Sequence, residues 1–260
     1  MAELNNSQRK NIPVVILAGG VGIRIGKDLE RIPKAMIDVN GIPILLCVMD
    51  HYAKYGFSKF IICAGYGKEV VEEFVKRIPA INTNLNINVK ARGIDRSKWQ
   101  IKVVDTGIEN KTASRLALVR GIVSKSPFFC LTYGDTYSDI NIDKLLQFHF
   151  SHRKTASLLA VHMPTRFRIL GLYGDDPLLR GFSDKPILQN DYINGGFYVF
   201  NDSIFQLSSL NASVNNSLEI DILEELVAKK EICAYKYSKG IWQYIDNERN
   251  RKELCDIINS

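Results

Sequence analysis

The chain has 260 residues, of which 46% are hydrophobic and 24% charged, and its formal net charge is +6. This composition is typical of a globular protein with one large core or two small ones. No apolar stretch approaches the roughly 20 residues of a membrane span, and the polar start from Met1 to Asn11 has no apolar signal segment. We therefore expect a cytoplasmic protein that does not enter a membrane.

Basic residues and cysteines are both spread along the chain. A nucleic-acid-binding protein would gather its positive charge into one arm or helix face, so this distribution argues against a nucleic acid partner. The five cysteines occur singly, without a pair at zinc-ligand spacing, which favours small core residues over a zinc site.

Short apolar runs alternate with helical periodicity through the first part of the chain. Strands are predicted at Pro13–Ala18, Phe60–Ala64 and Phe128–Tyr133, with marginal strands at Leu85–Val89 and Ile101–Val104. Helices are predicted at Pro43–Tyr55, Lys68–Arg77, Ala113–Val123 and Ile142–His152. Strand, helix and strand in this order imply a parallel sheet.

The rest of the chain adds strands at Ser157–His162 and Gly195–Phe200, and helices at Glu219–Lys229 and Glu248–Ile258. The turn-rich stretch from Leu170 to Pro186 favours short antiparallel pieces. Since no linker or repeat interrupts the pattern, we predict a single α/β domain over residues 12–260, preceded by a polar extension of residues 1–11.

A glycine-rich segment, Gly19-Gly20-Val-Gly22-Ile-Arg24, directly follows the first strand. Glycines there allow backbone N–H groups to approach a phosphate, and an arginine can neutralise it. An ordinary tight turn explains the glycines equally well. Lys34, ten residues later and behind a proline, is placed to reach the same phosphates, although a surface loop lysine is the alternative.

Asp135 ends an apolar strand, where open α/β sheets collect their ligands, and it is a candidate Mg²⁺ ligand. Two acids can complete the site: Asp139, close in sequence, and Asp246, which ends the run from Trp242. Either can instead be an N-cap or turn residue. We favour Asp246 as the second ligand and Asp139 as structural.

Two further polar segments are candidates for binding an acceptor. Lys185 can bind a phosphate, and Asp184 and Asn194 can bind hydroxyl groups. A turn followed by a glycine bulge at Gly195 accounts for both segments without a ligand.

The motifs LAGGxGxR, PKxM, FIICxGY, VDTG, TYGD, INGGF and WQxxD occur in this order between Val14 and about Glu253. In this combination the chain resembles the glucose-1-phosphate cytidylyltransferases, a branch of the sugar-1-phosphate nucleotidyltransferases. The resemblance implies a mixed, mostly parallel α/β sheet of the GT-A-like type. It also implies a Rossmann-like nucleotide-binding half at about residues 12–140 and an acceptor-binding half at about 141–260.

The resemblance also assigns roles to individual residues. It makes Arg24 and Lys34 catalytic and Asp135 and Asp246 the Mg²⁺ ligands. The implied nucleotide-binding residues are Leu17, Ala18, Gly19, Gly20, Gly22, Arg24, Lys34 and Arg115. The implied acceptor contacts are Tyr133, Asp184, Lys185, Asn194 and Gly195. Such enzymes assemble as oligomers, so a homo-oligomer is expected.

Several departures from the family pattern fall within the motifs themselves. Ile23 replaces a threonine of the glycine-rich motif, Ala113 and Ser114 replace two glycines before Arg115, and Asp184 replaces a glutamate. A polar pocket with altered hydrogen-bonding groups tends to reject its original ligand. We therefore hold CTP more firmly than glucose 1-phosphate as a substrate.

The reaction implied is an in-line attack by an acceptor phosphate oxygen on the α-phosphorus, with pyrophosphate as the leaving group. Mg²⁺ would bridge the reacting phosphates, and Arg24 with Lys34 would stabilise the leaving group. Two alternatives stay open: the same chemistry with UTP, GTP or dTTP, and a catalytically silent relative that binds a nucleotide or a sugar phosphate.

Overall fold

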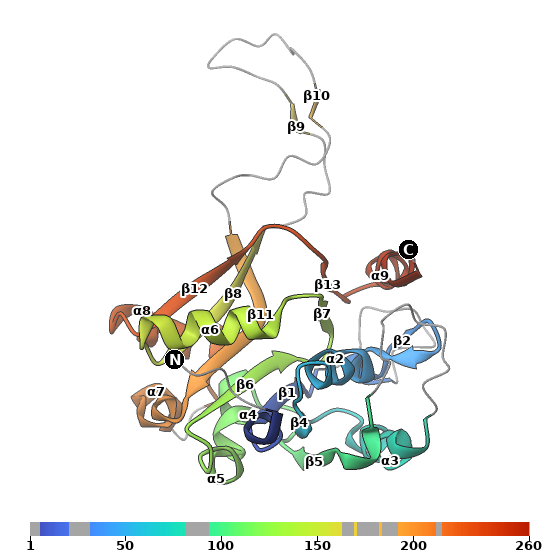
Figure 1. Cartoon of the computed structure of the whole chain (residues 1–260), viewed down its shortest axis with the longest axis horizontal. Coiled ribbons are helices and arrows are strands. Elements are labelled where there is room, and N and C mark those ends of the chain that lie inside the picture. The colour runs from blue at the N-terminus through green and yellow to red at the C-terminus, as the bar shows by residue number, and fades with distance from the viewer. Residues whose placement is uncertain are drawn as a thin grey trace.

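The centre of the protein is a seven-stranded sheet with the order β12-β8-β11-β6-β1-β4-β5 (Figure 1). The computed structural model describes residues 6–20, 32–81, 94–162, 169–170, 182–183, 192–211 and 215–259. The strands of this sheet are β1 (Pro13–Ala18), β4 (Lys59–Ala64), β5 (Gln100–Asp105), β6 (Phe128–Tyr133), β8 (Ala156–His162), β11 (Tyr192–Asn201) and β12 (Ile232–Tyr237).

Parallel pairing places the carboxyl ends of four strands at one edge of the sheet. β1 pairs in parallel with β4 and β6, and β4 pairs in parallel with β5. β11 runs antiparallel between β6 and β8, while β12 is parallel to β8. The parallel pairing of β1, β4, β5 and β6 agrees with the prediction from the order of elements, and the sheet as a whole is mixed and mostly parallel, as the resemblance implied.

Helices cover both faces of the sheet because its inner strands are apolar on both sides. Val14 and Ile16 of β1 face one core, and Val15 and Leu17 face the other. The first core is closed by α2 (Ile44–Ala53), α3 (Lys68–Arg77), α6 (Ile142–His152) and α9 (Glu248–Asn259). The second is closed by α4 (Thr112–Leu118), α5 (Arg120–Val123), α7 (Ser208–Asn211) and α8 (Leu223–Ala228).

Three two-stranded ribbons lie outside the main sheet. They pair β2 (Asp38–Val39) with β3 (Ile42–Pro43), β7 (Thr136–Ser138) with β13 (Trp242–Tyr244), and β9 (Ile169–Leu170) with β10 (Phe182–Ser183). All three are antiparallel, so the antiparallel pairing expected between Leu170 and Pro186 is confirmed for β9 and β10. The predicted strand at Leu85–Val89 lies outside the described residues.

Two helices differ from the periodicity-based predictions. The helix expected over Ala113–Val123 is divided at Val119 into α4 and α5. The helix expected from Glu219 begins as a π-helical turn, Leu218–Ile222, before α8. Apolar spacing alone does not distinguish a helix break or a π-helical turn from a continuous α-helix, because the apolar residues stay on the buried side in each case.

The start of the chain contacts the domain. Asn6–Arg9 forms one helical turn, α1, and Arg9 Nη1 lies 2.5 Å from Asp143 Oδ1 and donates to the carbonyl of Tyr55.

Among the described helices, none is long and apolar enough to cross a bilayer.

A buried histidine network connects α6 to β8 and β11. His152 Nδ1 accepts from the backbone N–H of Lys154, so its Nε2 carries the hydrogen and donates to Ser157 Oγ at 2.7 Å. Ser157 then donates to His149 Nδ1 at 2.9 Å, and His149 Nε2 donates to Asn201 Oδ1 at 3.0 Å. Burial lowers the pKa of His149 to about 4, so His149 is neutral near pH 7, and in this state each hydrogen of the network has one acceptor.

We expect the free energy of unfolding to fall as the pH drops from 6.5 towards 4. Burial lowers the pKa of His149 and of His51 from 6.5 to about 4, so between these values the unfolded chain binds more protons than the folded protein. Each histidine then removes up to about 3 kcal/mol. Urea unfolding at pH 5 to 7 measures this slope. In His149→Gln, the slope of the unfolding free energy against pH should correspond to about one proton fewer. An unchanged slope would contradict the neutral state of His149.

Candidate active site

The carboxyl edge of the sheet brings the glycine-rich motif beside the segment that carries Asp135. The backbone N–H of Gly134 donates to the carbonyl of Leu17 at 2.9 Å. A Cβ atom at Gly134 would lie 3.1 Å from Cβ of Ala35 and 3.3 Å from Cβ of Ala18. Glycine at this position therefore lets the β6 end, the β1 end and the Lys34 segment pack closely.

Pairing between β7 and β13 places Asp246 next to Asp135. Thr136 lies opposite Tyr244, and beyond this pair the backbone N–H of Ile245 donates to the carbonyl of Asp135 at 2.9 Å. The two carboxylates are 111 positions apart in the chain (246 − 135), and this one antiparallel register brings them together.

Lys34 completes the cluster. It opens a short 3-10 helix, Lys34–Met36, directly after Pro33. Its Nζ lies 3.0 Å from Asp246 Oδ1 and 3.8 Å from Asp135 Oδ2. The side chains of Lys34, Asp135 and Asp246 are 22%, 27% and 23% exposed, so the cluster is accessible from solvent.

The electrostatics of the cluster suit a bound cation. Burial raises the pKa of Asp135, the Lys34 ammonium group opposes this rise, and the nearby Asp246 adds to it. Mg²⁺ is commonly held by one or two protein carboxylates together with phosphate oxygens, so this donor set fits Mg²⁺ bound with a triphosphate. The described residues contain no group of three or more acidic, histidine or cysteine side chains that would bind a metal without other ligands.

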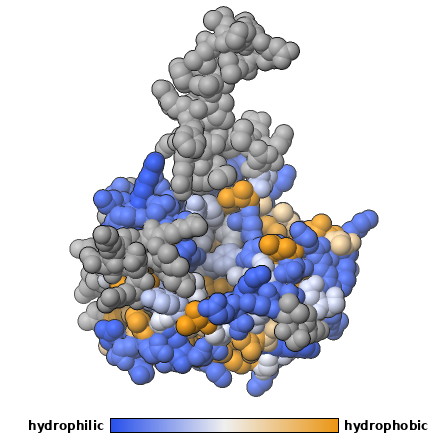
Figure 2. Space-filling view, turned by 180° about the vertical axis from the view of Figure 1, so that it is seen from behind, coloured by the Kyte–Doolittle hydropathy of each residue, from blue (hydrophilic) through white to orange (hydrophobic). Residues whose placement is uncertain are grey.

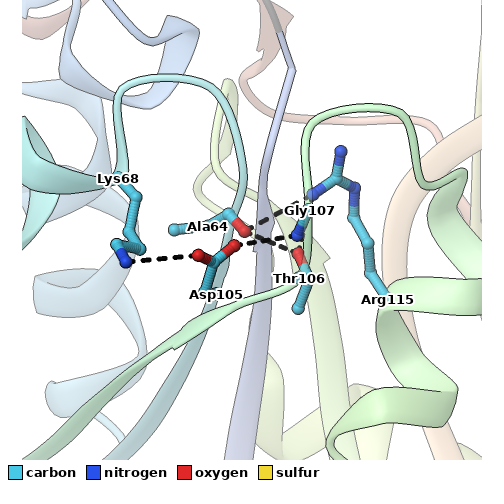
Figure 3. Close-up of polar contacts among 6 residues, drawn as sticks. All are labelled: Ala64, Lys68, Asp105, Thr106, Gly107 and Arg115. Atoms are coloured by element: carbon cyan, nitrogen blue, oxygen red, sulfur yellow. Dashed lines mark hydrogen bonds and ion pairs between the residues drawn. The ribbon is translucent and has the colours of Figure 1, made fainter.

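Arg115 of α4 joins the ends of three neighbouring strands, and Figure 3 shows its surroundings at the ends of β4 and β5. Its Nη1 donates to Thr106 Oγ1 at 2.7 Å and approaches the carbonyl of Ala64, while its Nη2 donates to the carbonyls of Gly19 and Ile108. Its side chain is buried among these backbone groups. Direct contact of Arg115 with a nucleotide stays a prediction.

The same guanidinium group explains why glycine follows two of these strands. A Cβ atom at Gly19 would lie 2.0 Å from Nη1 of Arg115, and one at Gly65 would lie 2.5 Å from it. Asp105 accepts from the backbone N–H of Gly107 and from Lys68, which holds the adjoining loop (Figure 3). The first glycine of the LAGG motif is therefore needed for packing against Arg115.

Three of the predicted acceptor residues are connected through Tyr198 and Trp242. The hydroxyl groups of Tyr133 and Tyr198 are 3.1 Å apart, and the amide of Asn194 donates to Tyr198. The carbonyl of Gly195 accepts from Trp242 Nε1 at 2.8 Å, which connects the INGG and WQxxD motifs. The structure thus brings Tyr133, Asn194 and Gly195 into one region.

The remaining site predictions have different outcomes. Gly22, Arg24, Asp184 and Lys185 lie outside the described residues. Leu17 and Ala18 end β1, and Gly20 approaches the Lys34 side chain, since a Cβ there would lie 3.8 Å from Lys34 Cδ. Asp139 accepts from the Ile241 backbone N–H at 2.7 Å and from Tyr237, contacts that hold the loop before α6.

Sequence reasoning missed Glu219, whose carboxylate accepts hydrogen bonds from the side chains of Tyr133, Thr112 and Ser217. Its position near the start of a predicted helix is typical of an acidic residue that interacts with the helix dipole. The backbone there forms a π-helical turn, a feature frequent at functional sites, which periodicity does not reveal.

Comparison with known proteins shows the family of this chain. The nucleotidyl transferase family matches residues 13–245. Glucose-1-phosphate cytidylyltransferase of Salmonella typhi is 32% identical, with 92% of this chain and 93% of that protein covered.

A second relative, D-glycero-alpha-D-manno-heptose 1-phosphate guanylyltransferase of Aneurinibacillus thermoaerophilus, is 26% identical and covers 94% of this chain and 99% of its own. In fold, a UDP-glucose pyrophosphorylase solved with UDP-glucose superposes with a TM-score of 0.70 at 15% identity, covering 95% of this chain and 97% of that one. The chain belongs to the nucleotidyl transferase family, as the resemblance to glucose-1-phosphate cytidylyltransferases predicted.

Proposed function

We propose that this nucleotidyl transferase couples CTP to a phosphorylated small molecule, glucose 1-phosphate or a related acceptor, and releases pyrophosphate. The observation that carries the proposal is the cluster of Lys34, Asp135 and Asp246 at the carboxyl edge of the sheet, with distances of 3.0 and 3.8 Å from Lys34 Nζ to the two carboxylates. One cation and two carboxylates at this place are the groups that metal-assisted phosphoryl chemistry needs.

In the proposed reaction an acceptor phosphate oxygen forms a bond to the α-phosphorus. The bond from the α-phosphorus to the oxygen bridging the α- and β-phosphates breaks, and pyrophosphate leaves with the electron pair. Asp135 and Asp246 would hold Mg²⁺, which would neutralise phosphate charge when bound. Lys34 donates hydrogen bonds to the triphosphate, and we assign the same role to Arg24. No protein nucleophile takes part.

Binding of the two substrates is divided between the two sides of Asp135. The nucleotide binds at the β1 end, to Leu17 to Gly20 and Gly22. Arg115 supports this segment through its hydrogen bond to the carbonyl of Gly19. Tyr133, Asn194 and Gly195, together with Asp184 and Lys185, receive the acceptor. We place this reaction in the cytoplasm and infer that the enzyme acts as a homo-oligomer.

Two alternatives follow from the same site. The heptose 1-phosphate guanylyltransferase relative supports transfer from a base other than cytosine. Departures at Ile23, Ala113 and Ser114 fall in the motifs that we assign to the nucleotide, which points the same way. Retention of Lys34, Asp135 and Asp246 in mutual contact argues against a catalytically silent binder.

The first test is pyrophosphate release with Mg²⁺ across CTP, UTP, GTP, ATP and dTTP, each combined with a panel of sugar 1-phosphates and other phosphorylated metabolites. We expect release with CTP and at least one acceptor. Release with a different nucleotide would move the assignment to that base, and no release with any pair would contradict the transferase activity.

A second prediction concerns Lys34→Met, which we expect to change two readouts in opposite directions. Pyrophosphate release should fall about a hundredfold or more, because a charged donor to the transition state is lost. Mn²⁺ binding to the nucleotide-free protein, measured by electron paramagnetic resonance, should become about tenfold tighter, because Lys34 no longer occupies the two carboxylates.

Lys68→Met is the matched control. Lys68 pairs with Asp105 at 3.2 Å and its side chain is 26% exposed, close to the value for Lys34, but its partner belongs to another strand end. Neither readout should change in this variant. Unchanged or weaker Mn²⁺ binding in Lys34→Met would contradict the assignment of Asp135 and Asp246 as the metal ligands.

A further inference from the structure

Three hydroxyl groups from separate elements converge on the Glu219 carboxylate. Thr112, the first residue of α4, donates to Oε2 at 2.7 Å, and Ser217 donates to the same oxygen at 2.5 Å. Tyr133, the last residue of β6, donates to Oε1. Glu219 therefore connects the helix that carries Arg115 with the strand that leads to Asp135.

Burial by itself would raise the pKa of Glu219, but the hydrogen bonds from Ser217, Tyr133 and Thr112 outweigh it and lower the pKa. The side chain is thus an ionised carboxylate near neutral pH. An ionised carboxylate accepts hydrogen bonds and has none to donate.

This property fixes the direction of a chain of hydrogen bonds. Since Tyr133 must donate its hydrogen to Glu219, its oxygen can only accept from the Tyr198 hydroxyl, 3.1 Å away. Tyr198 has then used its hydrogen, so its oxygen accepts from Nδ2 of Asn194. The chain runs in one direction, from Asn194 through Tyr198 and Tyr133 to Glu219.

The end of the chain at Asn194 is fixed from a second side. Its Oδ1 accepts from the backbone N–H of Gly196 at 3.0 Å, so the orientation of the amide group is determined. Gly196 has φ +74°, and a Cβ atom there would lie 2.5 Å from Cδ2 of Tyr133. The Tyr133 ring is therefore held directly against the start of β11.

We propose that Glu219 is a positioning residue of the acceptor site, which orients the amide of Asn194 through Tyr133 and Tyr198. Nδ2 of Asn194 carries two hydrogens, and the chain uses one of them. The other is then presented in a fixed direction to an oxygen of the acceptor, a hydroxyl or a phosphate. This inference rests on the proposed function, because it assigns Asn194 to the acceptor.

The decisive variant is Glu219→Gln, which keeps the shape of the side chain but can donate as well as accept. The direction of the chain is then no longer forced, so we expect the KM for the acceptor to rise about tenfold while the KM for the nucleotide stays within about twofold. Tyr133→Phe breaks the same chain. The double variant should be no worse than Tyr133→Phe alone, because both changes remove one coupled unit.

Two controls separate positioning from a structural role. Glu225→Gln alters a comparable carboxylate, which accepts from Ser208 and Ser209 and lies outside the chain, and it should leave both KM values unchanged. Thr112→Val removes another partner of Glu219 without touching Tyr133. Thr112→Val should lower the melting temperature without raising the KM for the acceptor. If Thr112→Val raised this KM as much as Glu219→Gln does, the proposal would be overturned.

Equilibrium binding of glucose 1-phosphate, measured by calorimetry, tests the same point without turnover. We expect affinity about tenfold weaker in Glu219→Gln than in the wild type, in agreement with the KM effect. Equal affinity, including no binding by either protein, would overturn the role of Glu219. If the wild type releases no pyrophosphate but Glu219→Gln binds glucose 1-phosphate more weakly than the wild type, only the transferase activity is overturned.

Discussion

The antiparallel pairing of β7 with β13 is the constraint on which the candidate site depends. It carries a segment near the end of the chain back to the β6 end, and its register places Asp246 beside Asp135. A slip of one residue would turn alternate side chains to the opposite face and separate the two carboxylates. Trp242 secures this ribbon to β11 through its hydrogen bond to the carbonyl of Gly195.

Bringing two carboxylates together at a partly buried strand end is unfavourable unless a positive charge accompanies them. Lys34 supplies that charge from a third segment, and the small residues Ala35 and Gly134 let this segment approach. The cluster is thus stable before any substrate binds. In the proposed reaction, the same lysine would turn to the triphosphate once a metal ion takes its place at the carboxylates.

The regular elements were predictable because apolar runs and helical periodicity are local properties: β1, β6, α3 and α6 begin and end where the sequence indicates. Strand-end position and the family motifs predicted Lys34, Asp135 and Asp246 as site residues, and the structure brings the three side chains together. Edge strand β12 was missed because its side chains alternate between partly buried and exposed, which weakens the apolar signal. Glu219 was missed because its partners Tyr133 and Thr112 are distant in sequence, and no local pattern reports such contacts.

The single strand that reverses direction explains why the residues that we assign to the acceptor lie next to Asp135, which we assign to Mg²⁺. β1, β4, β5 and β6 all end at the same edge, whereas β11, antiparallel to β6, begins there. The start of β11 therefore brings Asn194 and Gly195 beside Tyr133, where the β6 end turns towards Asp135. A fully parallel sheet would place that start at the opposite edge, so the mixed pairing is what brings Tyr133, Asn194 and Gly195 to the same edge as Lys34 and Asp135.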